Sequence, residues 1–131
     1  MLRPAGRAVV TTWGREDQSW GWYDDLRKEY QAVAKLSSQS LDQPGDLFDR
    51  FSRAGFSQIR IVPRELDMIY GNEEEWWSMQ WSISGRAGLE RLEPSRLEEL
   101  KACVFERMQA LRQADGFHDR LLAHCTIAVK P

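Results

Sequence analysis

The sequence has few of the residues that build metal centres, disulfide frameworks and nucleophilic catalytic pairs. Among its 131 residues are only two cysteines, Cys103 and Cys125, and two histidines, His118 and His124. No C-x-x-C or Cys/His ligand spacing occurs, so we expect neither a zinc site nor a disulfide framework. Neighbouring strand residues point to opposite faces, which argues against a His124–Cys125 pair. We expect His124 to be a structural or sheet-edge residue and His118 to be solvent-exposed in the turn after Gly116.

An excess of charge of one sign and long apolar runs are also missing. Lys and Arg total 18 against 20 Asp and Glu, which gives a net charge of −2. Without a basic face, nucleic acid is not an expected partner. No stretch approaches the ~20 apolar residues of a membrane span, and the N-terminus has no apolar run of a signal peptide. We therefore expect a cytoplasmic protein with no membrane partner, folded as a single domain over residues 1–131.

Phosphate-binding glycine motifs are absent too. No G-x-G occurs anywhere, and Gly85–Gly88 lacks the preceding strand and the spacing of a dinucleotide-binding turn. The acidic run Glu73–Glu75 follows Asn72, a pattern typical of a capped helix start more than of a paired-carboxylate catalytic site.

Tryptophan, in contrast, is abundant, with six in the chain. One interpretation is that these large side chains fill the core. The other is that they form the walls of an aromatic-lined pocket for a small apolar or aromatic ligand. The candidate pocket residues are Trp20, Trp22, Trp76, Trp77 and Trp81, and Trp13 lies near the first group in the sequence.

Hydrophobic periodicity and turn residues predict three strands and four helices in an α/β arrangement. Gly55 is expected to end the second helix, Pro63 the middle strand, and Gly85 with Gly88 the third helix. The second helix is expected to bury Leu47, Phe48 and Phe51. In chain order the predicted elements are a strand at 7–13, a helix near 24–33, a helix at 44–54, a strand at 58–62, a helix from 72, a helix from 94 to 114 and a strand at 121–129.

Several motifs in this order resemble the C-terminal part of class I S-adenosylmethionine-dependent methyltransferases of the small-molecule type. The first resembles the family's L-(K/R)-P-G-G turn before its fifth strand, with Ala5 in place of the first glycine. The second resembles the family's sixth strand and the helix before it, around "AGF". The motifs are Leu2–Gly6 with the strand to Trp13, Phe51–Phe56 with Gln58–Val62, Glu74–Trp77, Asp115–Gly116 and Ile127–Pro131.

This resemblance implies a partial Rossmann-like methyltransferase fold. Its three-stranded mixed sheet would have the family's strand order 5-7-6, with the last strand antiparallel and about four helices. The family's glycine-rich cofactor turn lies upstream of the L-(K/R)-P-G-G turn, so the resemblance implies a truncated, substrate-side domain. No catalytic or cofactor-binding residue carries over, and no cofactor is expected here, although the intact family uses S-adenosylmethionine. We expect this chain to be inactive alone; the alternative is a stand-alone dimeric ligand-binding or interaction module.

The exposed edge expected for the strand Arg7–Trp13 indicates what the protein pairs with. In the family's sheet the fifth strand also pairs with the fourth, which has no counterpart in this sequence. The strand contains no proline, and Arg7 is its only charged residue, so it lacks the usual protection of a sheet edge. We expect a homodimer through this edge, or pairing with a separately encoded N-terminal half.

Overall fold

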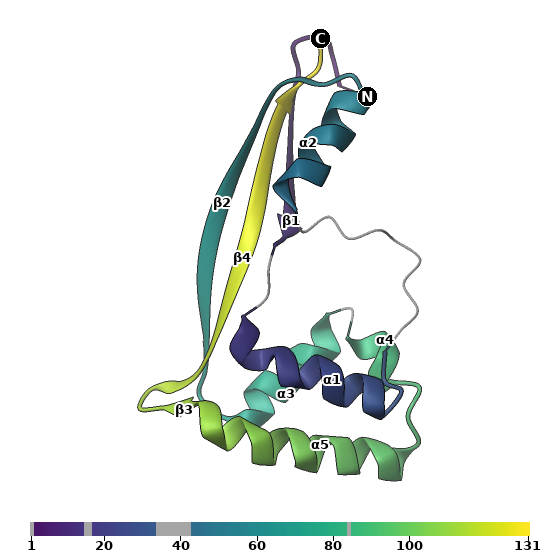
Figure 1. The fold of residues 1–131 in the computed structure, drawn as a ribbon, viewed down its shortest axis with the longest axis vertical. Coiled ribbons are helices and arrows are strands. Elements are labelled where there is room, and N and C mark those ends of the chain that lie inside the picture. The colour runs from purple at the N-terminus through teal and green to yellow at the C-terminus, as the bar shows by residue number, and fades with distance from the viewer. Residues whose placement is uncertain (1, 15–16, 34–42, 84) are drawn as a thin grey trace. The chain divides into compact units, whose positions relative to one another are not determined.

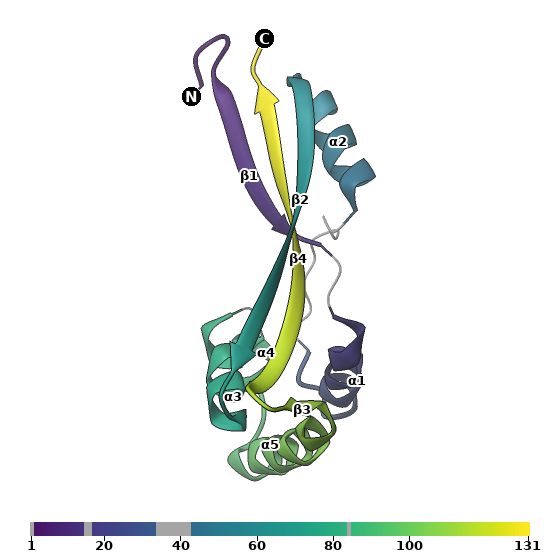
Figure 2. The same ribbon diagram turned by 90° about the vertical axis from the view of Figure 1, so that its left-hand side faces the viewer.

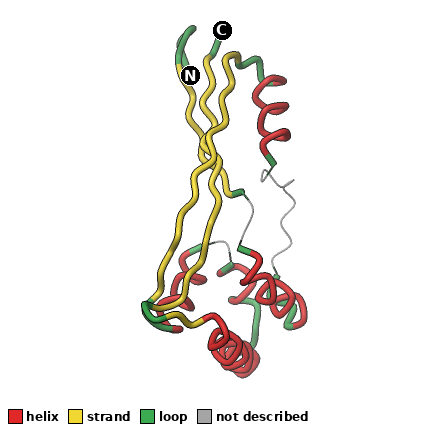
Figure 3. Tube along the Cα trace, turned by 60° about the vertical axis from the view of Figure 1, so that its left-hand side comes forward, coloured by secondary structure: helices red, strands yellow, loops and turns green. Residues whose placement is uncertain are grey.

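The computed structural model describes residues 2–14, 17–33, 43–83 and 85–131 as a mixed α/β structure (Figure 1). Figure 3 separates its helices from its strands by colour. The chain divides into two compact units. Unit 1 comprises Met1–Glu16, Ser38–Leu66 and Arg120–Pro131, and unit 2 comprises Asp17–Ser37 and Asp67–Asp119.

The sheet contains four strands in the described part of the chain. The strands are β1 (Arg7–Trp13), β2 (Ser57–Tyr70), β3 (Arg112–Gln113) and β4 (Gly116–Val129). Their path is β1-β4-β2, with β3 paired to β4. The last strand thus lies between the other two predicted strands, and it is antiparallel to β1 (Figure 2). The predicted number of three is wrong because the chain turns tightly after Gln113 and forms the short β3–β4 pair.

Strands β2 and β4 are longer than the sequence indicated. Pro63 is the predicted end of the middle strand, but β2 continues to Tyr70. Proline lacks a backbone donor, yet β2 is an outer strand of the sheet, where proline is tolerated. β4 begins at Gly116, five residues before the predicted start at Leu121. Gly116 has a φ of 130°, and a Cβ there would overlap the carbonyl oxygen of Tyr70, so only glycine fits this turn.

The helices number five in the described residues, one more than predicted. The bounds are α1 (Gly21–Glu29), α2 (Pro44–Arg53), α3 (Glu73–Ser82), α4 (Arg86–Leu89) and α5 (Pro94–Met108), with the 3₁₀ turns η1 (Gln18–Trp20) and η2 (Gln109–Leu111). Gly88 does not break a helix; it lies inside α4, where a Cβ would overlap the carbonyl oxygen of Ala32. The chain leaves α5 at Met108 through η2, so the predicted continuation to residue 114 is wrong.

The end of α2 in unit 1 confirms the predicted role of Gly55. Its φ is 81°, and the amide of Phe56 donates to the carbonyl of Phe51 at 3.0 Å while that of Gly55 donates to Ser52, also at 3.0 Å. This pair of bonds is the Schellman motif. The rings of Phe51 and Phe56 also meet edge to face with centroids 5.5 Å apart, which is the apolar contact that accompanies the motif.

The burial of α2 differs from the prediction. Leu47 is buried, with 2% of its surface exposed, and Phe51 is half-buried. Phe48 is 50% exposed, so its predicted burial is wrong. Neighbouring residues of a helix point about 100° apart, and the side of α2 that carries Leu47 is buried while the side that carries Phe48 is exposed.

The hydrophobic core of unit 2 joins η1, α1, α3, α4 and α5. Its fully buried members include Leu89, Leu100, Val104, Met108 and Phe117. None of the described helices is long and apolar enough to cross a membrane.

Candidate functional site

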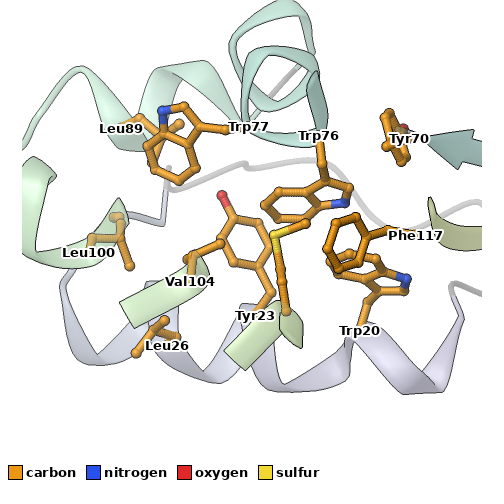
Figure 4. Packing of buried hydrophobic residues seen from close by; sticks show 12 residues of the cluster. Trp20, Tyr23, Leu26, Tyr70, Trp76, Trp77, Leu89, Leu100, Val104 and Phe117 are labelled. Carbon is orange, nitrogen blue, oxygen red and sulfur yellow. The ribbon is translucent and has the colours of Figure 1, made fainter. Parts of the chain in front are cut away.

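An aromatic cluster in unit 2 contains all five predicted pocket residues. Trp20 from η1 and Trp76 from α3 stack with ring centroids 4.8 Å apart and planes 9° from parallel. Trp76 also meets Tyr23 of α1 edge to face, with ring centroids 4.9 Å apart (Figure 4). Such aromatic pairs contribute about 0.5–1.5 kcal/mol beyond their burial. Two segments more than 50 residues apart therefore meet in one cluster.

The remaining predicted tryptophans lie around this stack. Trp22 is 6.0 Å from the Trp20 ring, and Trp77 is buried with its ring edge to face with Phe105 at 6.5 Å. Trp81 is partly buried and packs against the same cluster. Trp20, Trp76 and Trp77 are 7%, 2% and 6% exposed, so they are core residues. Whether the cluster also lines a ligand pocket stays a prediction.

The polar atoms of the cluster differ in whether they have a hydrogen-bond partner. Trp20 donates its indole Nε1–H to the carbonyl of His118 at 2.8 Å. The hydroxyl of Tyr23 and the Nε1 of Trp76 are buried without a hydrogen-bond partner among the described residues. Burial raises the pKa of Tyr23 to about 12, so its hydroxyl stays protonated and can donate. The cluster therefore holds two buried donors that an acceptor could satisfy.

His118 lies between two carboxylates, an arrangement that the sequence does not predict. Its Nδ1 lies 2.9 Å from Asp67 Oδ2 and its Nε2 lies 2.9 Å from Asp115 Oδ1. Only 14% of the His118 side chain is exposed, so the predicted solvent exposure is wrong. The reason is that β4 begins early, which places His118 in a strand and not in a turn. The sequence signal for this site is the position of Asp115 three residues before His118.

The two carboxylates set the charge of His118. Hydrogen bonds to Asp115 and then Asp67 raise the pKa of the imidazole, while the pKa of Asp115 is lowered chiefly by its hydrogen bond with His118. The imidazolium form donates from both ring nitrogens, so neither is free to accept a proton. This arrangement suits a structural clamp between β2, β4 and the turn before β4 more than a general base.

The acidic run at the start of α3 is a structural cap, as predicted. Asn72 accepts a hydrogen bond from the Glu75 amide at 2.9 Å, and Glu75 accepts one from the Gly71 amide at 2.7 Å. Glu73 accepts from Gln109 at 2.6 Å and from Arg112 at 2.9 Å. The pKa of Glu73 is lowered to about 2, first by the Gln109 bond, then by its own backbone amide and by Arg112. These carboxylates are thus committed to helix capping and pairing.

The remaining candidates for chemistry do not form sites. His124 is buried and Cys125 half-buried at adjacent positions of β4. Gly14 of the same unit is buried and makes room for His124, because a Cβ at Gly14 would lie 2.8 Å from the imidazole Nε2. Within residues 2–14, 17–33, 43–83 and 85–131, no group of three or more His, Cys, Asp or Glu is arranged to hold a metal ion.

The segment Gly85–Gly88 contributes to the short helix α4. Gly85 is the N-cap of α4, a helix of four residues, and Gly88 packs directly on the backbone of Ala32.

No protein-family model and no curated protein matches this chain. The solved structures that match it include two that align with 99% of the chain. One is a protein from Bacillus halodurans assigned as a methyltransferase, with 16% identity and a TM-score of 0.49. The other is phosphoethanolamine N-methyltransferase 2 of Haemonchus contortus, in complex with phosphomonomethylethanolamine and S-adenosylhomocysteine, with 18% identity and a TM-score of 0.35. The chain spans 58% of the first protein's length and 27% of the second's.

Proposed function

We propose that this chain is a methyltransferase-like, substrate-side domain that by itself neither binds S-adenosylmethionine nor transfers a methyl group. The observation that carries the proposal is the turn before β1. Gly6 donates its amide to the carbonyl of Arg3 at 2.8 Å, which places Pro4 and Ala5 at the centre of a β-turn. Ala5 has a φ of 60°, the left-handed conformation that favours glycine at this turn position.

Gly6 is required for a different reason. A Cβ on Gly6 would lie 2.7 Å from the Arg3 carbonyl oxygen, which is closer than real Cβ atoms approach. The geometry thus favours glycine at both positions that are glycine in the family's P-G-G turn. The sequence match at Leu2–Gly6 is supported by a backbone requirement and not by letters alone.

The "AGF" motif gives independent support of the same kind. Gly55 holds a left-handed φ in the Schellman motif, and Phe56 closes the motif on Phe51. A helix that ends in this way and leads at once into a strand accounts for the order helix, A-G-F, strand. Two motifs of the resemblance therefore have physical reasons for their glycines.

The proposed lack of cofactor binding rests on the missing G-x-G motif. Calorimetric titration with S-adenosylmethionine tests it, with S-adenosylhomocysteine as a second ligand and circular dichroism to show a folded sample. We expect no saturable heat with either ligand. A micromolar dissociation constant would contradict the proposal.

A second candidate function is a stand-alone module that binds a small aromatic ligand with a hydrogen-bond acceptor. The observation that favours it is the pair of unsatisfied donors, Tyr23 Oη and Trp76 Nε1, inside the aromatic cluster. Tryptophan fluorescence during titration with phenols, aromatic carboxylates and indoles tests it. We expect quenching that Tyr23→Phe weakens and that Trp13→Phe, at an exposed position of unit 1, leaves unchanged. Fluorescence that no ligand alters would exclude this function.

A further inference from the structure

The strand β1 has an unpaired backbone edge within the described residues. At its two ends Gly14 donates to the carbonyl of Leu122 at 2.6 Å, and Lys130 donates to the carbonyl of Gly6 at 2.9 Å. Gly6 and Gly14 are even-numbered residues that flank β1, and both bonds fit the register that pairs Arg7 with Val129. Antiparallel strands alternate their bonding direction, so the backbone groups of the odd residues Arg7, Val9, Thr11 and Trp13 point away from β4.

This edge carries apolar side chains and little protection. Val9 and Trp13 are each 61% exposed, and Val10 is 40% exposed. The strand has no proline, and Arg7 is its only charge. The other outer strand of unit 1 differs, since β2 contains Pro63 followed by Arg64 and Glu65. Proline and charge are the usual devices against edge pairing, so the sequence protects β2 and leaves β1 open.

We propose that two copies of this chain pair through β1, antiparallel and around a two-fold axis that passes between the two Val10 residues. In this register Arg7 lies opposite Trp13 of the second copy, and Val9 lies opposite Thr11 of the second copy. All four outward amides and all four outward carbonyls of each β1 then find partners, because every odd residue faces an odd residue. Any shift along the strand leaves some of them unpaired.

The side chains agree with the same register. Arg7 faces the indole of Trp13 of the second copy at each end, which allows two cation–π contacts. The two Arg7 charges lie at opposite ends of the paired strands, about 20 Å apart for six residues at ~3.4 Å each. At the centre Val10 meets Val10, an apolar pair at the position where antiparallel Cα atoms come closest. The occupant of this edge is therefore a second copy, and its register is fixed by its own sequence.

The test places charge on the proposed axis. Val10→Lys and Val10→Glu each put two like charges directly opposite one another, so we expect both variants to sediment as monomers where the unmodified chain forms dimers. An equimolar mixture of the two variants puts Lys opposite Glu, and we expect it to sediment as a heterodimer. Val33→Lys is the matched control, because Val33 is also 40% exposed but lies in unit 2. It is expected to leave the dimer intact.

Circular dichroism of each variant separates dissociation from unfolding, and recovery of the dimer in the mixture requires folded chains. The inference is overturned if the unmodified chain sediments as a monomer at all concentrations, or if both Val10 variants stay dimeric. It is also overturned if both variants dissociate and the mixture fails to associate, because Val10 would then not lie on the axis. Each result is independent of S-adenosylmethionine binding.

Discussion

Replacing Ala5 with glycine should stabilise the protein, although most alanine-to-glycine substitutions do the opposite. Ala5 has a φ of 60°, and its turn is held on both sides of the strand end by the bonds Ala5 N–H to Lys130 O and Lys130 N–H to Gly6 O, each 2.9 Å. These hydrogen bonds hold the backbone of Ala5 in its left-handed conformation, so the strain is not relieved by a local change.

The magnitude follows from two opposing effects. A left-handed L-residue costs about 1–2 kcal/mol, which Ala5→Gly removes. Glycine also gives the unfolded chain more freedom, which lowers stability by about 0.4–1 kcal/mol. The net gain in the free energy of unfolding is about 0.5–1 kcal/mol, or roughly 2–4 °C in Tm for a chain of this size.

The matched control is Ala54→Gly. Ala54 is the C-cap of α2 at a φ of −77°, so the same chemical change there relieves no strain. We expect a loss of about 0.5–1 kcal/mol. Urea denaturation followed by circular dichroism, at one fixed protein concentration, measures both variants. If Ala5→Gly lowers the midpoint as much as Ala54→Gly does, Ala5 is not strained and the argument from the turn fails.

Three further predictions concern unit 2. His118 should titrate above its ordinary pKa of 6.5. The stability that its charge contributes is fully present below pH 6.5 and is lost as the pH rises through the raised pKa. An NMR titration that gives a pKa below 6.5 would contradict the clamp. Gly88→Ala should destabilise by about 1–3 kcal/mol because its Cβ overlaps backbone, whereas Gly45→Ala, with open space around it, should not; thermal melts that rank them the other way would refute the packing. Leu100→Ala should cost about 2–5 kcal/mol and Leu66→Ala, 49% exposed, much less; equal urea midpoints for the two would show that the core is misassigned.

The strand β1 and the end of α2 were predictable because their signals are local. A run of β-branched residues between two glycines defines β1, and the left-handed Gly55 followed by Phe56 defines the cap. Local signals also placed the start of α3 at Asn72. The sequence therefore predicts elements well where a single residue satisfies a backbone need.

What could not be predicted depends on contacts between distant segments. Pro63 predicts the end of a strand. Proline is tolerated inside β2 only because β2 is an edge strand of the sheet. The His118 clamp needs Asp67, which is 51 residues away. The tryptophan cluster was predicted as a group, but the stacking of Trp20 on Trp76 and the isolation of Trp13 in the other unit follow from the fold.

Because each unit consists of separate chain segments, unit 1 cannot finish folding until the last of its segments has been synthesised. The last segment of unit 2 ends at Asp119, whereas unit 1 needs Arg120–Pro131, which the ribosome makes afterwards. β1 is synthesised before Ala123–Val129, its partner in β4, and more than a hundred residues separate the two segments. Closing so long a loop is slow, and an apolar strand with both edges open is prone to pair wrongly in the meantime. We therefore expect β1 to stay exposed in the nascent chain until β4 has emerged from the ribosome.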